Sequence, residues 1–292
     1  MRTHFIAAAM MAIGCLHGLA LAEQAAGAED IPDACRYDSD DQIDYQACFD
    51  AAEPNSVIWM LAAINLGSEA FWNDDVETAA HYYDLSTPDD QQIISDIILH
   101  ANRADVFRRV GRPDDSLNDA RFAWQMVQEG RYDLKGNPLD DEAKLYVLQL
   151  IVQTFDEAAA PERDAVVRAY LDTPVRTETD LANKVAVLTE IGRYDEALPL
   201  SGELVASLPE HFGVLNNHCY LLTLMGRAPE GLPYCQKAVA LAPDVASLQH
   251  SLALALAAAG RCEEAGAALA KAHALEPSVV KYAEPVACTA PE

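Results

Sequence analysis

The sequence predicts an all-α fold, a solenoid of about six stacked helical hairpins, and two observations support this prediction. The dipeptide Gly-Arg recurs every 34 residues, at Gly192-Arg193, Gly226-Arg227 and Gly260-Arg261. A proline follows each of these glycines by 17 residues, at Pro209, Pro243 and Pro277. An alanine-rich apolar segment lies between each glycine and its proline. A fixed period with a turn, a helix and a closing proline is typical of a helical-repeat array.

Each part of the period has a physical role. Glycine supplies the backbone geometry of the turn between two antiparallel helices, and proline ends the second helix. The small residues Ala197, Gly231 and Ala265 let the paired helices approach closely. Residues 178–277 therefore resemble the tetratricopeptide repeat (TPR) family. The resemblance implies a right-handed superhelical solenoid that binds a protein or peptide along its concave face.

The first 22 residues are predicted to be a signal peptide. Arg2 precedes the apolar run FIAAAMMAIG, and Ala20-Leu21-Ala22 gives a small-x-small cleavage pattern. Ile13-Gly14-Cys15 loosely resembles a lipobox, so a lipoprotein anchored at Cys15 is the alternative. The sequence predicts an exported protein of a bacterial periplasm, with no transmembrane segment in the mature chain.

Residues 23–54 are predicted to form an irregular acidic leader. Four aspartates lie close together, at Asp38, Asp40, Asp41 and Asp44. A calcium loop of the EF-hand type needs a glycine at its sixth position and an acid at its twelfth, where this segment has Ile43 and Phe49. We therefore interpret the aspartates as solvated surface.

The helical array is predicted over residues 55–278. The expected helix pairs that precede the regular repeats cover residues 56–72 and 75–86, 89–110 and 113–128, and 142–159 and 162–171. Asp74 takes the place of the turn glycine in the first pair. Residues 129–175 form an irregular unit that begins with a loop rich in glycine and proline. Residues 279–292 are predicted to cap the array, with a short helix over 279–283.

Six cysteines remain after residue 22, and an even number in an exported protein favours disulfides. Six cysteines permit 15 pairings. Cys35 and Cys48 are expected to close a local loop, and Cys219 and Cys235 to join the two helices of one hairpin, a spacing that resembles one in exported TPR proteins. Cys262 and Cys288 would then tie the last repeat to the C-terminal tail. Free buried thiols are the alternative.

Composition limits the classes of function. The net charge of −26 argues against nucleic acid as a partner, because phosphates require a basic surface. This acidity suits either a basic partner or the solvation of outer faces. The sequence has no nucleophile motif, no phosphate loop and no metal-binding motif, so we predict no enzyme activity, no cofactor and no metal.

One set of polar residues indicates a binding surface. Asparagine occupies the same position of the first helix in four hairpins, at Asn65, Asn102, Asn183 and Asn217. Asparagine is unfavourable inside helices, and its amide can both donate to and accept from a peptide backbone. The TPR resemblance places these residues on the concave face, with neighbours Trp72, Asp105, Arg108, Arg109, Asn216, Tyr220 and Thr223. Bonds to neighbouring helices, including a salt bridge from the arginines to Asp105 or Asp114, are the alternative.

We therefore expect a scaffold that binds a protein or peptide, as part of a cell-envelope assembly. A structural module that self-associates without a ligand is the first alternative. An enzyme accessory with its site in residues 129–175 is the second.

Overall fold

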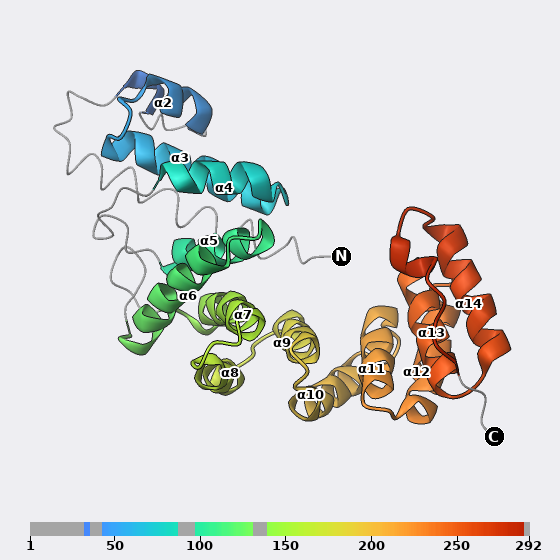
Figure 1. The fold of residues 1–292 in the computed structure, drawn as a ribbon. Helices are drawn as coiled ribbons and strands as arrows, with labels where there is room; N and C mark the ends of the chain where they lie inside the picture. Colours follow the sequence, from blue (N-terminus) through green and yellow to red (C-terminus); the bar gives the residue numbers. More distant parts are fainter. Residues whose placement is uncertain (1–31, 36–42, 87–96, 131–138, 289–292) are drawn as a thin grey trace. The chain divides into compact units, whose positions relative to one another are not determined.

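The computed structural model describes residues 32–35, 43–86, 97–130 and 139–288. The chain divides into two compact units, Met1–Pro174 (unit 1) and Val175–Glu292 (unit 2), which are described separately below. Every regular element in the described residues is a helix (Figure 1). The all-α class predicted from the sequence is therefore confirmed.

Unit 1 contains three helical hairpins after two short N-terminal helices. Its elements are η1 (Asp33–Cys35), α2 (Tyr45–Ala51), the pair α3 (Val57–Trp72) and α4 (Val76–Leu85), the pair α5 (Ile97–Arg109) and α6 (Pro113–Gln128), and the pair α7 (Asp141–Glu157) and α8 (Arg163–Asp172). The pair α7 and α8 is the irregular unit that breaks the 34-residue phase.

Unit 2 contains the three regular hairpins. Its elements are the pair α9 (Glu178–Glu190) and α10 (Tyr194–Ser207), the pair α11 (Phe212–Leu224) and α12 (Ala228–Leu241), the pair α13 (Ala246–Ala258) and α14 (Cys262–Leu275), and the 3-10 turn η2 (Val280–Tyr282). Each hairpin repeats the previous one 34 residues later, as the sequence period predicts.

The hairpin turns share one backbone geometry. Gly192, Gly226 and Gly260 adopt the left-handed conformation, with φ between 74° and 75°. Asp74 takes the same conformation with φ 64°, as expected for the residue that replaces glycine in the first hairpin. The amide that follows each of these residues donates to a carbonyl in the last turn of the first helix, as from Arg227 to Leu222 at 2.8 Å. This bond satisfies a carbonyl at the helix end that would otherwise lack a partner.

Small residues permit the close crossing of paired helices. Ala197 and Ala265 are buried where the sequence places the crossing. A Cβ atom at Gly231 would lie 3.0 Å from the carbonyl oxygen of Cys219 on the partner helix, and one at Gly67 would lie 2.7 Å from the ring of Tyr83. Glycine is required at these two places by space rather than by backbone angle.

The first helices of successive hairpins pack against one another. In unit 1, α5 contacts both α3 and α7, and in unit 2, α11 contacts both α9 and α13. The second helices of successive hairpins make no comparable contact in the described residues. In each unit the first helices therefore line the inner side of the stack, and we call their exposed side the inner face.

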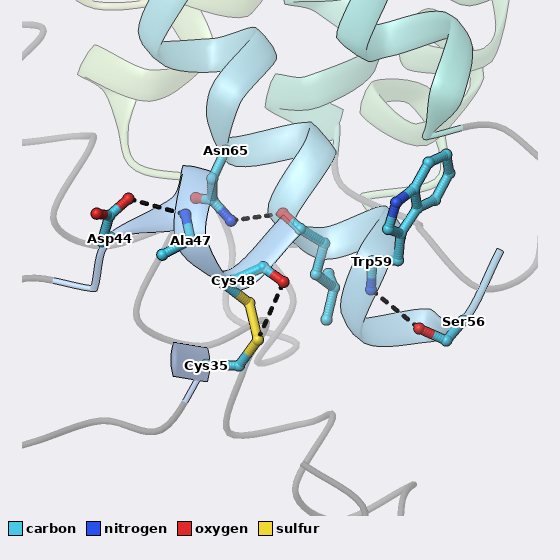
Figure 2. Close-up of a disulfide and its surroundings, with 8 residues drawn as sticks. Cys35, Asp44, Ala47, Cys48, Ser56, Trp59 and Asn65 are labelled. Atoms are coloured by element: carbon cyan, nitrogen blue, oxygen red, sulfur yellow. Dashed lines mark hydrogen bonds between the residues drawn. A yellow bond between two sulfur atoms is a disulfide. The ribbon is translucent and has the colours of Figure 1, made fainter. Parts of the chain in front are cut away.

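A disulfide-closed segment covers the first hairpin of unit 1. Cys35 and Cys48 are joined, with their Cα atoms 4.7 Å apart, and α2 packs on α3 (Figure 2). The ring of Phe49 stacks on Trp59 at 4.8 Å. The prediction of an irregular leader is wrong for residues 45–51, because the Asp44 side chain caps a helix by accepting from the amide of Ala47 at 3.0 Å.

A second disulfide-closed segment covers the last hairpin of unit 2. The short helix expected over residues 279–283 is a single 3-10 turn, η2. Tyr282 is buried against Ala246 and Ala272, and Cys288 is joined to Cys262 with a Cα distance of 5.6 Å. The third disulfide, Cys219–Cys235, links α11 to α12 across one hairpin.

Several sequence predictions concern residues outside the described part. These are the signal peptide with Cys15, the aspartates 38, 40 and 41, the start of the helix predicted over 89–110, and most of the loop 129–141. Within the described residues, no helix has both the length and the hydropathy needed to cross a bilayer.

Candidate functional site

The predicted peptide-binding residues all lie on first helices, but their burial and bonding differ between the two units. Unit 1 holds Asn65, Trp72, Asn102, Asp105, Arg108 and Arg109, and unit 2 holds Asn183, Asn216, Asn217, Tyr220 and Thr223. Each unit is considered by itself.

In unit 1 the first asparagine, Asn65, forms a hydrogen bond within its own helix. Asn65 is buried, with 7% of its surface exposed, and its Nδ2 donates to the carbonyl of Leu61 at 2.7 Å (Figure 2). The amide therefore satisfies a polar group inside α3 rather than facing a ligand.

The second asparagine is bound by a neighbouring hairpin. Asn102 is 4% exposed, and its Oδ1 accepts from the hydroxyl of Tyr146 on α7 at 2.6 Å. The ring of Tyr146 lies 5.8 Å from that of Trp72 on α3. Burial, followed by the electrostatic effects of Tyr83 and Asp105, raises the pKa of Tyr146 well above its usual value, so this hydroxyl stays a hydrogen-bond donor. Three first helices thus meet at one internal contact.

The basic pair of α5 is neutralised inside unit 1. Arg108 binds Asp105 at 2.5 Å and Glu157 of α7 at 2.9 Å. Arg109 binds Asp74 at the first hairpin turn at 2.5 Å. The Arg108–Asp105 pair is the internal salt bridge that the sequence left open as an alternative, whereas the pairs with Glu157 and Asp74 were not predicted.

In unit 2 the corresponding residues are accessible. Asn217 and Tyr220 are exposed on α11, and Asn183 is half-buried on α9. None of the three side chains has a hydrogen-bond or ionic partner in the described residues. Thr223 differs, because its hydroxyl donates to the carbonyl of Cys219 at 2.9 Å. The Oδ1 of Asn216 is buried without a partner among the described atoms.

Leu224 extends the exposed side of α11 and is not among the residues predicted from the sequence. Asn217, Tyr220 and Leu224 are spaced i, i+3 and i+7, so they form one stripe on the helix. Tyr220 is 36% exposed and Leu224 is 39% exposed. Counting the same helical spacing onward from Asn217 would have found this leucine.

A depression lies at the turn between α9 and α10. It has a volume of about 480 Å³ and is lined by Gly192, Arg193, Tyr194, Asp195, Glu196 and Met225. Met225 directly follows Leu224, and Arg193 pairs with Glu196 across the turn, with its Nε 3.0 Å from the carboxylate. The depression is therefore lined by both polar and apolar side chains, and its arginine is paired with a glutamate of the same lining.

A disulfide closes the hairpin that carries the stripe. The Cys219–Cys235 disulfide joins α11 to α12, and both sulfur-bearing residues are fully buried. His218 of α11 is directed at α10, with its Nδ1 2.9 Å from the hydroxyl of Ser201. This serine–histidine pair is buried, at 2% and 8% exposure, so it faces the helix packing and not a substrate.

No group of three or more histidine, cysteine, aspartate or glutamate residues is placed to hold a metal ion in the part of the chain that the structure describes. The stripe on the inner face of unit 2 consists of an amide, an aromatic and an aliphatic side chain, Asn217, Tyr220 and Leu224.

No protein-family model matches the sequence, and no curated protein matches it. Among solved structures, the chain is similar to MamA residues 41-end from Desulfovibrio magneticus RS-1, with 23% identity over 48% of this chain and 79% of that chain and a TM-score of 0.37. Another MamA crystal structure has 13% identity over 64% of this chain and 94% of that chain, with a TM-score of 0.41. YrrB, described as a TPR protein with an unusual peptide-binding site, has 15% identity over 65% of this chain and 91% of that chain, also with a TM-score of 0.41.

The chain's own geometry identifies its repeats. Two antiparallel helices occupy each 34-residue period of unit 2, and a left-handed residue separates them at each turn. Asp74 gives the first hairpin of unit 1 the same turn. A helix-turn-helix unit of this length is typical of helical-repeat arrays. The three hairpins of unit 2 therefore have the period and the turn geometry that are typical of tetratricopeptide-like helical repeats.

Proposed function

We propose that this chain is an exported scaffold that binds a protein or peptide on the inner face of unit 2, as part of a cell-envelope assembly. The observation that carries the proposal is the stripe on α11. Asn217 and Tyr220 are exposed there, and neither side chain has a partner among the described residues.

The chemistry of the stripe fits a polypeptide ligand. An amide can donate to a backbone carbonyl and accept from a backbone amide, so Asn183 and Asn217 could hold an extended chain at two points. An exposed tyrosine supplies a large contact area with few rotatable bonds, which is why tyrosine is common at the centres of protein interfaces.

Unit 1 contrasts with this arrangement and narrows the proposed site. Asn65 and Asn102 bond internally, and Arg108 and Arg109 are paired with carboxylates. A ligand would have to break these contacts before it could use the same groups. We therefore leave the unit 1 residues out of the proposed binding site.

Export is supported by the cysteines. Three disulfides join all six cysteines of the described residues. Disulfides persist in oxidising compartments and are rare in the reducing cytosol. Together with the signal-peptide pattern at the N-terminus, they favour a place in the cell envelope.

A crosslinked capture from cell-envelope extract tests the proposed function. The purified wild type would be compared with Asn183→Ala/Asn217→Ala and with Gln236→Ala, which removes an exposed amide from the second helix α12. We expect mass spectrometry to identify a protein captured by the wild type and by Gln236→Ala but lost in the double variant, because only the inner face has changed.

Equal capture by all three proteins would contradict the proposal. Recovery of only a second copy of this chain, with a dimer in sedimentation, would replace the scaffold with a self-associating module.

A further inference from the structure

Two inner helices of unit 2 carry no charged side chain. The sequences of α11 (FGVLNNHCYLLTL) and α13 (ASLQHSLALALAA) contain no aspartate, glutamate, lysine or arginine. In a chain with 23% charged residues, two helices of 13 residues each would on average hold about six. The first helix α5 of unit 1 shows the contrast, with Arg103, Asp105, Arg108 and Arg109 over the same length.

The histidines of these two helices do not add charge near neutral pH. Burial lowers the pKa of His218, and the nearby Arg227 lowers it further. Burial also lowers the pKa of His250, whose ring lies 5.1 Å from that of Tyr282, and Lys281 adds to the effect. Both imidazoles are therefore neutral at pH 7.

Many charges of unit 2 are placed on the second helices and are paired there. At the start of these helices an arginine binds the glutamate three residues later, as in Arg227–Glu230 at 2.7 Å and Arg261–Glu264 at 2.5 Å. The two charges of each pair cancel beside the turn, so each pair adds little net charge near the stripe.

The first helix α9 contains charged residues, but none of them is exposed in the middle of the helix. Asp180 accepts from the backbone amide of Thr177 at the helix start, and Lys184 is buried. Glu190 is exposed at the last position of the helix, where it is equivalent to Leu224 one period later. The uncharged surface therefore extends from α11 towards α13 and is bounded by Glu190 on the side of α9.

Apolar residues flank the large side chains of α11. The 34-residue period places Ala186 of α9 and Leu254 of α13 at the positions equivalent to Tyr220, on the two helices that contact α11. Ala186 is exposed and Leu254 is half-buried. Ala258 of α13, also exposed, is equivalent to Leu224. Tyr220 and Leu224 are therefore bordered by apolar side chains rather than by charged ones at these positions.

We propose that the segment bound on this face is an uncharged, apolar stretch of polypeptide that packs on Tyr220 and Leu224. This inference rests on the proposed function and names the chemistry of its ligand. An ionic group buried on an uncharged surface loses its hydration and gains no opposite charge, so the face disfavours lysine-rich and glutamate-rich segments alike. An apolar segment gains by removing the tyrosine, leucine and alanine surfaces from water. The net charge of −26 thus keeps the protein soluble and does not select the ligand.

Fluorescent synthetic peptides test this proposal by anisotropy on the full chain. Peptides of about 12 residues can cross three inner helices spaced by about 10 Å. The three sets share leucine, phenylalanine and alanine, with blocked termini, and differ only in serine and asparagine, lysine, or glutamate at the remaining positions. We expect only the serine and asparagine set to bind, with nearly equal affinity at about 50 mM and about 300 mM NaCl.

Variants place the binding on the inner face. We expect Tyr220→Ala to weaken the uncharged peptides about tenfold or more. Ala186→Lys should weaken them too, because it adds a charge at an exposed position while Tyr220 stays in place. Leu241→Ala, which removes a 42% exposed leucine from the outer helix α12, should change nothing. Far-ultraviolet circular dichroism checks that each variant is folded.

The outcomes separate this inference from the proposed function. Preference for the lysine set, with affinity that falls as salt rises, would overturn the inference and leave the scaffold function standing. Binding of uncharged peptides that Tyr220→Ala does not weaken would overturn the proposed location. No binding by any set at about 1 mM, where the free energy of binding is only about 4 kcal/mol, would count against the scaffold function as well.

Discussion

At the turns between helices, the cost of the backbone conformation depends on the residue that adopts it. Gly226 has φ 74°, and an added Cβ would meet nothing within 4 Å, so space does not require glycine there. Ala159 has φ 49° at the turn between α7 and α8, and it is exposed. A left-handed alanine costs about 1 kcal/mol relative to glycine because its Cβ approaches the backbone.

Opposite substitutions at these two turns should therefore have opposite effects on stability. We expect Gly226→Ala to lower the free energy of unfolding of unit 2 by about 1 kcal/mol, and Ala159→Gly to raise that of unit 1 by about 0.5–1 kcal/mol. Urea titrations measure both changes. All three tryptophans, Trp59, Trp72 and Trp124, lie in unit 1, so fluorescence follows that unit while circular dichroism follows the whole chain. A loss of stability in Ala159→Gly would show that the turn geometry is wrong.

The asparagines show what spacing can predict and what it cannot. The sequence places Asn65, Asn102, Asn183 and Asn217 at one position of the repeat, and the structure finds all four on first helices. Whether an amide is available depends on its neighbours. Asn102 accepts a hydrogen bond from Tyr146, which lies 44 residues later in the irregular hairpin. The 34-residue repeat does not predict the position of this tyrosine. Whether each amide is free to bind a ligand could therefore be determined only from the structure.

At the scale of helices, the regular repeats were predictable and the ends were not. The sequence predicts the helix over 113–128 with the bounds that the structure gives to α6, because Pro113 marks its first turn. The helix α2 was missed because seven residues give little periodic signal, and its stability depends on the Cys35–Cys48 disulfide and on packing against α3. Both terminal segments are thus held by covalent closure in addition to their apolar contacts.

We expect Cys262→Ser/Cys288→Ser to lower the free energy of unfolding of unit 2 by about 3 kcal/mol. The disulfide closes a loop with a sequence separation of 26 residues, and its removal increases the freedom of the unfolded chain. Val286 and Cys288 also pack against the core of the last hairpins, so the tail should separate from α14 more readily. Circular dichroism during urea unfolding measures the change.

The tryptophan fluorescence transition provides the control for this double variant. It reports unit 1, which contains neither cysteine, and it should stay where it is in the wild type. An unchanged circular dichroism transition would mean that η2 and the tail add nothing to the stability of unit 2.

At the scale of the whole molecule, charged residues are unevenly distributed among the helices. The net charge is −26, yet α11 and α13 contain no charged residue. On the inner face of unit 1 the polar residues bond to one another, whereas on the inner face of unit 2 Asn217, Tyr220 and Leu224 are exposed. The sequence predicts a repeat scaffold. Its net charge does not show which helices are uncharged at the surface or which charges are paired, because pairing depends on the folded arrangement.

The central claim is that a partner binds the inner face of unit 2, and site-specific photocrosslinking in intact cells tests it directly. A photoreactive phenylalanine derivative would replace Tyr220 in one protein and Leu241, which is similarly exposed on the outer helix α12, in another. We expect a discrete adduct with one partner protein from position 220 and none from position 241. The same adducts from both positions, or none from position 220, would contradict the claim.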